Sequence, residues 1–362
     1  MQKDTRQLSF SAIAISKRKV KRDFFNQIDQ LLDWTAIDME IRKYYTKGAS
    51  VAGRPSYPGL LLFKMALLQT WYGLSDYEVE DRINDSLSFM QFVGLTLEDE
   101  VPDHSVLSRF RTTLTQKDGY EPLMNLINTQ LEAQNIVLKQ GAIVDASITA
   151  SPRKPRGKKE YEQVATDREE GVSDPAVARP AQPEFIEKVQ SHVDTEAAWI
   201  KKAGKLHYGY KKHTATDEQG LVLAVVTTPA NESDIVHLQD VVAKAKLQRK
   251  ARVRADKGYC SAGNREYLSG QGLKDGIMHK AVRNKKLNSH QLRFNKLVSK
   301  IRYRVERTFG GMMRWFGAGK ARYLGRAKTH TQHIMEGLAY NLYRAPGIVV
   351  LNQINRQIER AK

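Results

Sequence analysis

The sequence predicts an all-α region over the first 135 residues, followed by an α/β domain with a mixed five-stranded sheet flanked by helices. Three observations support this. The first 135 residues place apolar side chains at helical spacing between short polar turns. From residue 136 onward, short apolar runs typical of buried strands appear. Their order is strand, strand, strand, helix, strand, helix, strand, helix, which favours a layered α/β domain.

Recognisable start signals mark the helices of the N-terminal region. Ser75 and Glu78 have the spacing of a capping box, and Asp103 is a residue type that opens a helix. The helix after Asp103 carries Arg109 and Arg111 beside its apolar face. The other expected helices cover residues 60–68, 76–89 and 122–134.

Turn residues and acids delimit the strands of the α/β domain. The expected strands are 142–145, 205–216, 221–228, 252–256 and 276–282. The expected helices are 234–246, 264–268 and a long final helix with an apolar stripe from Phe294 to Phe309. Residues 151–198 mix Pro, Lys, Arg and Glu with few large apolar residues, which indicates an exposed insertion. The predicted domains are 1–135, 136–345 with that insertion, and a C-terminal tail at 346–362.

The composition excludes several classes of protein. Of the 362 residues, 41% are hydrophobic and 27% charged, which is enough apolar surface for a core and excludes wholesale disorder. No apolar stretch approaches the roughly 18 residues of a membrane span, and no secretory signal is expected at the first residues. Cys260 is the single cysteine, which excludes an internal disulfide and fits a reducing cytoplasm.

The positive charge is concentrated in one third of the chain. Residues 251–362 hold 24 Lys and Arg against 6 Asp and Glu, a difference of +18 that equals the net charge of the whole chain. The first 250 residues therefore balance, with 34 of each sign. An excess confined in this way predicts a surface for a polyanion.

Three acids stand at distinctive places in the predicted topology. Asp145 ends the first strand, Asp256 ends the fourth, and Glu306 lies on the helix after the fifth. If the first and fourth strands are neighbours, the two aspartates lie side by side and need a neutralising charge. Carboxylate oxygens suit Mg²⁺, and a third carboxylate on a facing helix would complete a two-metal site for in-line displacement at phosphorus.

Each acid also has an ordinary structural interpretation. Asp145 can be a turn or cap residue, and Asp256 can cap the loop that follows it. Glu306 can form a surface ion pair with Arg302, four residues earlier. The residues alone leave both interpretations open.

The motifs around these acids make the sequence similar to a known family. From about residue 10 to residue 345, the chain resembles a DDE transposase of the insertion sequence 5 family of bacterial mobile elements. The matching segments of the α/β part are AIVDAS at 142–147, GK at 204–205, YGYKKH at 208–213, TTPANESD at 227–234, ADKGY at 255–259 and RYRVERTF at 302–309. Those of the N-terminal part are GRP at 53–55, WYGLSD at 71–76, PDHS at 102–105 and RFR at 109–111.

The resemblance implies a ribonuclease-H-like catalytic domain and an N-terminal region that binds the ends of the element. It implies that Asp145, Asp256 and Glu306 are catalytic and bind the metal, with two Mg²⁺ ions per site and Mn²⁺ as a substitute. The family usually has a basic residue seven positions after the glutamate. Met313 occupies that position here, and Arg314 follows it.

Basic side chains around the predicted site are candidate DNA contacts. On the strands, a solvated face is the alternative interpretation. For the N-terminal helices, a helix-turn-helix reader of the major groove and a plain scaffolding or dimerisation bundle remain equal alternatives. The candidates are Arg54, Arg109, Arg111, Lys205, Lys211, His213, Arg302, Arg304, Arg307, Arg314 and Arg322.

The activity implied by the resemblance is transposition. Such an enzyme binds the terminal inverted repeats of an insertion sequence and catalyses metal-dependent strand cleavage and 3′-hydroxyl strand transfer. A ribonuclease-H-like structure-specific endonuclease and a domesticated, non-catalytic DNA-binding protein are the alternatives. We expect double-stranded DNA as the partner, a homodimer in the DNA complex because two element ends must be paired, and no membrane partner. The expected location is the bacterial cytoplasm, at the nucleoid when bound.

Overall fold

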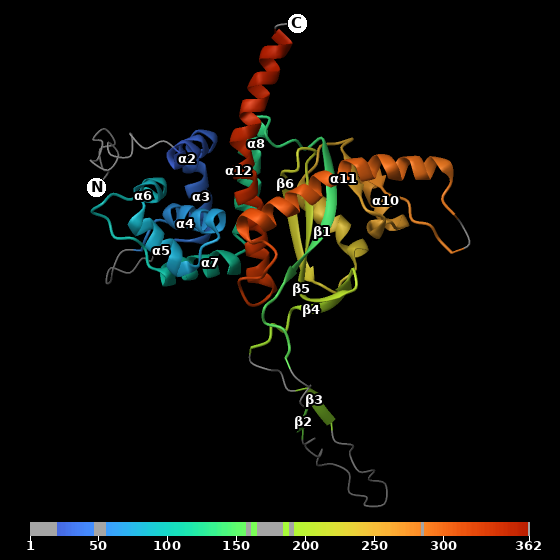
Figure 1. The fold of residues 1–362 in the computed structure, drawn as a ribbon, viewed down its shortest axis with the longest axis horizontal. Helices are drawn as coiled ribbons and strands as arrows, with labels where there is room; N and C mark the ends of the chain where they lie inside the picture. The colour runs from blue at the N-terminus through green and yellow to red at the C-terminus, as the bar shows by residue number, and fades with distance from the viewer. Residues whose placement is uncertain are drawn as a thin grey trace, which may run out of the picture.

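A computed structural model of the chain describes residues 20–46, 56–156, 161–164, 184–187, 192–283 and 286–360. The N-terminal helices lie on one side of the long helix α12 (Arg326–Arg360), and the β-sheet lies on its other side (Figure 1). This arrangement confirms the predicted helical region followed by a mixed sheet flanked by helices. The candidate Arg54 lies outside the described residues.

The N-terminal helices begin where the predicted caps place them. Ser75 and Glu78 form both hydrogen bonds of a capping box, and the side chain of Asp103 accepts from the backbone N–H groups of Ser105 and Val106. The predicted single helix over 76–89 is wrong, because Ser86 leaves helical geometry and caps a new helix. The helices are α2 (Val20–Leu31), α3 (Trp34–Tyr44), α4 (Gly59–Tyr72), α5 (Asp76–Asp85), α6 (Leu87–Val93), α7 (His104–Gln116) and α8 (Tyr120–Ala133).

The main sheet is mixed and has six strands rather than the expected five. Its order is β4-β5-β1-β7-β8, and β6 pairs with β5 beyond the end of β4. β5 runs antiparallel to β1, β4 and β6, whereas β7 runs parallel to β1 and β8. The strands are β1 (Gly141–Ala150), β4 (Ala198–Lys202), β5 (Lys205–Thr216), β6 (Val222–Pro229), β7 (Arg252–Ala255) and β8 (Lys274–Ile277).

The extra strand, β4, forms because β5 is longer than its partner β6. The first residues of β5 extend past β6 and need other partners for their backbone N–H and C=O groups. β4 supplies them at the end of the segment predicted as an insertion. Within that segment, β2 (Tyr161–Val164) and β3 (Glu184–Glu187) pair with each other as a separate two-stranded sheet.

Hydrogen bonds close the base of this insertion. The backbone N–H of Asp194 donates to the carbonyl of Arg153 (2.9 Å), and that of Ser151 donates to the carbonyl of Tyr208 (2.8 Å). The hydroxyl of Tyr208 donates to the carbonyl of Asp194 (2.6 Å), and that of Tyr210 donates to its Oδ1 (2.7 Å). The two ends of the excursion are therefore fixed to β5.

Helices cover both faces of the sheet. Helix α9 packs on β6 and β5, whereas α11 packs on β1 and β7 and also contacts α12. The predicted boundary between residues 345 and 346 falls inside α12, which continues through Pro346. No described helix is both long and apolar enough to cross a membrane. The remaining helical elements are η1 (Asp234–His237), α9 (Leu238–Ala245), η2 (Lys257–Tyr259), α10 (Ala262–Gly270) and α11 (Ser289–Phe316).

One hydrophobic core runs through the N-terminal helices, α12 and the sheet. Polar contacts cross the same junction. The indole N–H of Trp71 donates to the carbonyl of Ala339 on α12 (2.9 Å), and Asn341 exchanges hydrogen bonds with the backbone of Val222 (2.7 Å each). The helical region and the sheet therefore share their interior.

A buried ion pair joins α12 to the centre of the sheet. The ammonium of Lys212 on β5 lies 2.8 Å from Oε2 of Glu336, and the two side chains are 2% and 3% exposed. Gln332 donates to the other carboxylate oxygen of Glu336 at 2.8 Å. Because water reaches neither side chain, each charge is stabilised by the other.

We predict that Glu336→Ala destabilises the protein by about 3–5 kcal/mol, because it leaves the Lys212 charge buried without a partner. Urea unfolding of the purified protein measures this. The double variant Lys212→Met/Glu336→Leu removes both charges and should recover most of the loss. A single variant within about 0.5 kcal/mol of the wild type would contradict the prediction.

Candidate active site

The pairing of β1 with β7 brings two of the predicted acids together. Val144 pairs with Ala255 in parallel register, so the next residues, Asp145 and Asp256, stand side by side. Oδ1 of Asp145 accepts from the backbone N–H of Ala146 at 2.8 Å. The Asp256 carboxylate caps the short helix η2. The first and fourth predicted strands, β1 and β7, are therefore neighbours, as the expected pairing of the two aspartates requires.

A guanidinium lies between the two aspartates. Nη2 of Arg302 on α11 donates to Oδ2 of Asp145 at 2.5 Å, and Nη1 lies 3.4 Å from Oδ1 of Asp256. Burial lowers the pKa of Arg302, but the charges of Asp145, Asp256 and Glu306 outweigh it and hold that pKa above its ordinary value. The paired carboxylates thus already hold a positive charge, which offsets their repulsion.

Glu306 lies one turn after Arg302 on α11 and is exposed. It acts on Arg302 through its charge, yet it forms no described contact with either aspartate. Among the described residues, no group of three or more His, Cys, Asp or Glu side chains is close enough to hold a metal ion. The structure therefore brings the two aspartates together and places the glutamate nearby, but not in contact.

Helix α11 is held in place over the aspartates by its ends and its inner face. Asn288 and Gln291 form a capping box at its start, and Gly317 ends it in a left-handed conformation. On the inner face, Val305 and Met312 are buried in the core, and the hydroxyl of Thr308 donates to the carbonyl of Gly220 (2.6 Å). This packing fixes the direction in which Arg302 points.

Two residues predicted to touch DNA from β5 are instead buried. Lys211 donates to the carbonyl of Glu232 (2.6 Å) and to Asp234 (2.8 Å). His213 is fully buried, and burial lowers its pKa to about 4, so it is neutral near pH 7. Contact with DNA is contradicted for both. The reason is that β5 lies inside the sheet between β1 and β6, where polar side chains pair locally.

The sequence reasoning missed Tyr259, which ends the short helix η2 that Asp256 caps. It is buried, and its hydroxyl lies 3.3 Å from Nδ1 of His213. Burial, together with the charges of Asp234 and Asp145, raises its pKa well above the ordinary value, so it stays protonated. The signal was present in the ADKGY segment, where Tyr259 follows Asp256 by three residues.

The other basic candidates fall into three groups. Lys205 is exposed at the start of β5, and Arg307 and Arg314 are exposed on α11. Arg304 is half-buried and donates to the carbonyl of Glu218 (2.5 Å). Arg322 donates to the carbonyls of Leu74 (2.9 Å) and Phe316 (3.4 Å), which places it at the junction with the N-terminal helices.

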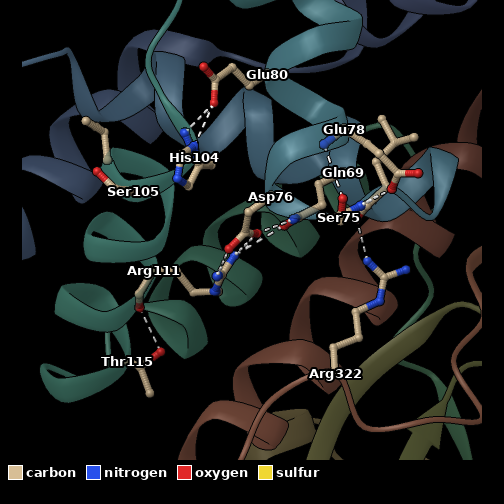
Figure 2. A network of polar contacts seen from close by, with 12 residues as sticks. Gln69, Ser75, Asp76, Glu78, Glu80, His104, Ser105, Arg111, Thr115 and Arg322 are labelled. Carbon is tan, nitrogen blue, oxygen red and sulfur yellow. Dashed lines mark hydrogen bonds and ion pairs between the residues drawn. The ribbon is translucent and has the colours of Figure 1, made fainter.

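Arg111 belongs to the interior of the N-terminal region, which contradicts a DNA contact. It is 7% exposed, and Figure 2 shows it reaching from α7 toward Asp76 and Gln69. Its Nη2 and Nη1 lie 2.7 and 3.0 Å from the two oxygens of Asp76, and its guanidinium stacks over Tyr323 at 4.3 Å. Arg109, two residues earlier, is exposed and stays a candidate.

We predict that Arg111→Ala lowers the free energy of unfolding by about 2 kcal/mol, because Asp76 then loses a charged hydrogen-bonding partner. Arg109→Ala is the matched control on the same helix and should change stability by less than about 0.5 kcal/mol. Denaturant unfolding compares the two. Equal losses for both variants would show that the Asp76 pair is not the cause.

Comparisons with known proteins agree with this architecture. A family model described as "Transposase DDE domain" matches residues 138–342, and one described as "Transposase domain" matches residues 14–113. A transposase for insertion sequence element IS1106 from Neisseria meningitidis serogroup B is 36% identical over 239 residues, which is 66% of this chain and 76% of that protein.

Two solved structures are also similar to the chain. A piggyBac transposase synaptic complex with hairpin DNA has 10% identity and a TM-score of 0.36, covering 92% of this chain and 74% of that one. A Mos1 strand transfer complex has 10% identity and a TM-score of 0.20, covering 83% and 81%. Because the DDE domain matches more than half of the chain, and a transposase of a bacterial insertion sequence is 36% identical to it, the chain belongs to the DDE transposases.

Proposed function

We propose that this transposase cleaves and joins DNA at a site built from Asp145, Asp256 and Glu306. The observation that carries the proposal is the parallel register of β1 and β7, which sets two carboxylates side by side with a cation between them. Acids that only cap a turn or a helix do not need this arrangement. Holding two carboxylates close together costs free energy because they repel each other. Sites that maintain such a pair are often functional sites.

We further propose that the α/β part is ribonuclease-H-like. Its strands follow the order β6-β5-β1-β7-β8, with the first three antiparallel and the last two parallel to β1. The candidate acids stand on β1, directly after β7, and on the helix that follows β8. The resemblance of the sequence predicts the same placement.

The carboxylates fit a divalent metal site by their chemistry. Hard cations take oxygen ligands, and the Asp145–Asp256 pair already holds the positive charge of Arg302. We propose that Asp145, Asp256 and Glu306 hold two Mg²⁺ ions, with Mn²⁺ as a substitute. Bound ions of this kind activate water or a hydroxyl and stabilise the leaving oxygen of a phosphodiester.

The side chains of this chain bind and orient the DNA. Asp145 on β1 and Asp256 directly after β7 supply negative charge at fixed positions, which limits reorganisation during the reaction. The guanidinium of Arg302 contacts both carboxylates and offsets their negative charge. We propose that the exposed side chains of Arg307, Arg314 and Lys205 contact phosphates. Because no covalent protein nucleophile is needed, the same site serves hydrolysis and strand transfer.

Recognition of the element's terminal inverted repeats is proposed for the N-terminal helices, with exposed Arg109 as the remaining described candidate there. A homodimer in the DNA complex is proposed because two ends must be brought together for transposition. The pairing of the aspartates in the sheet bears on neither end recognition nor dimerisation, so each of these two properties needs its own test.

We predict that Asp145→Asn, Asp256→Asn and Glu306→Gln each lower strand cleavage by about 10²-fold or more, since each removes a reacting-centre carboxylate. Cleavage of a labelled element end measures this, and gel shift in EDTA should show DNA binding kept. Asp240→Asn, an exposed acid on α9, is the matched control and should cleave normally. Normal cleavage by Glu306→Gln would remove the glutamate from the proposed site.

We also predict a specific metal dependence. Mg²⁺ or Mn²⁺ should restore cleavage after EDTA treatment, whereas Ca²⁺ should support binding with little cleavage, because its looser coordination positions the phosphate poorly. The readout is product formation on the same labelled end. Undiminished cleavage in EDTA would contradict the proposed metal site.

A further inference from the structure

The turn that carries Asp256 is anchored by one buried side chain. Asp256 caps η2, a short 3₁₀ helix, and accepts from the backbone N–H of Lys257 at 2.6 Å. Lys257 and Gly258 are exposed, so Tyr259 is the one buried residue of η2. The backbone N–H of Tyr259 donates to the carbonyl of Asp256 at 3.0 Å. The place of Tyr259 therefore sets the place of Asp256.

Tyr259 reaches His213 on the face of the sheet opposite the aspartates. Across β5 and β1, His213 pairs with Ala146, the neighbour of Asp145. Because successive side chains of a strand alternate between its two faces, His213 and Asp145 point to opposite faces. The hydroxyl of Tyr259 lies 3.3 Å from Nδ1 of His213. The turn after β7 thus reaches both faces of the sheet, with Asp256 on one and Tyr259 on the other.

The hydrogen bonds of His213 assign its tautomer. Nε2 lies 3.1 Å from Oγ1 of Thr228, and the hydroxyl of Thr228 donates to the carbonyl of Pro229 at 3.2 Å. The one hydroxyl proton of Thr228 is used there, so its oxygen accepts from Nε2–H, and Nδ1 is left as an acceptor. Burial keeps the pKa of His213 low and that of Tyr259 high, so the protonated hydroxyl donates to the neutral ring. A directed chain of hydrogen bonds therefore runs from η2 through β5 to the end of β6.

This chain lies in the interior of the protein. The side chains of Tyr259, His213 and Thr228 are all buried, so water does not compete for their hydrogen bonds. Buried Asn264 adds a further tie, because its amide donates to the carbonyls of Tyr259 and Ile235 at 2.9 Å each. Buried polar groups whose hydrogen bonds are all made rigidify their surroundings, which apolar packing of the same volume does less well. The polar chain thus indicates a demand on the orientation of η2.

We propose that Tyr259 and His213 are positioning residues, whose hydrogen bond sets the orientation of the Asp256 carboxylate for metal binding. The inference rests on the proposed function, because it concerns the same carboxylate. A ligand side chain must be held within about 0.5 Å of its productive place, and a 3₁₀ turn has poor hydrogen-bond geometry of its own. Because both side chains are buried on the opposite face, they act through Asp256 and not on the DNA itself.

The first test measures Mn²⁺ binding to the purified protein, with free Mn²⁺ followed by electron paramagnetic resonance. Tyr259→Phe keeps the ring, removes the hydroxyl, and should raise the Mn²⁺ dissociation constant about tenfold or more. Tyr208→Phe is the matched control, because it removes a buried hydroxyl that donates to the carbonyl of Asp194 (2.6 Å) at the base of the insertion. The control should bind Mn²⁺ as the wild type does. Equal affinities of the two variants would overturn the proposal.

Two substitutions of His213 separate the orienting bond from packing. The amide oxygen introduced by His213→Asn can lie near the position of Nδ1 and accept from Tyr259. The amide nitrogen introduced by His213→Gln can lie near the position of Nε2 and donate to Thr228, but Tyr259 then loses its acceptor. We expect Mn²⁺ affinity within about threefold of the wild type for His213→Asn and about tenfold weaker for His213→Gln. Equal losses, or a larger loss for the smaller asparagine, would assign His213 to packing and overturn the proposal.

Cleavage of a labelled element end supplies a second readout. Tyr259→Phe should raise the Mg²⁺ concentration for half-maximal cleavage about tenfold and recover most of the wild-type rate at saturating Mg²⁺. A smaller fraction of folded protein would instead lower the rate at every Mg²⁺ concentration and leave the half-maximal concentration unchanged. That second pattern would overturn the positioning role.

Asp256→Asn separates this inference from the proposed function. If Asp256→Asn binds Mn²⁺ as tightly as the wild type, the proposed metal site is wrong and the positioning role is overturned with it. If Asp256→Asn loses Mn²⁺ binding while Tyr259→Phe keeps it, the metal site stands and the positioning role alone is overturned. Weaker Mn²⁺ binding by both variants, with Tyr208→Phe unchanged, is the expected result.

Discussion

The parallel pairing of β1 with β7 is the interaction on which the rest of the site depends. A slip of one residue would move Asp256 away from Asp145 and turn alternate side chains to the opposite face. The register is fixed by burial, because Ile143, Val144 and Ala255 face the core. Helix α11 then packs on both strands and directs Arg302 to the paired carboxylates. The juxtaposition of the two carboxylates thus follows from the packing of the apolar residues that directly precede them.

Helix α12 extends this dependence to the whole molecule. It packs on β6 and on α2, α4, α7 and α8, so the helical region and the sheet share one core. The buried Lys212–Glu336 pair and the Trp71–Ala339 hydrogen bond lie along it. Unfolding of either part would expose apolar side chains of the other to water. We therefore infer that the N-terminal helical region and the sheet unfold as one cooperative unit, which would keep them in a fixed relative orientation.

Much of this architecture could be predicted from local sequence signals. Caps at Ser75 and Asp103 work through residues three positions apart, and the place of Asp256 directly after β7 follows from a short apolar run. The predicted end of the first strand at Asp145 is wrong, because β1 continues to Ala150 in its pairing with β5. The burial of Arg111 and His213 could not be predicted in this way. Arg111 pairs with Asp76, 35 positions away, and His213 meets Tyr259, 46 positions away, so only the folded chain shows that these polar side chains are internal. Strand β4 was missed because its sequence continues the polar insertion before it.

Two tyrosines of β5 hold the base of the insertion closed. Tyr208 and Tyr210 donate hydrogen bonds to Asp194 at one end of the insertion, and Ser151 at the other end is hydrogen-bonded to the same strand. Both ends of the insertion are therefore fixed to β5. Doubling the length of a loop whose ends are already tied costs only about 0.6 kcal/mol. We therefore expect the sheet to tolerate changes in the length of the chain between these two fixed ends.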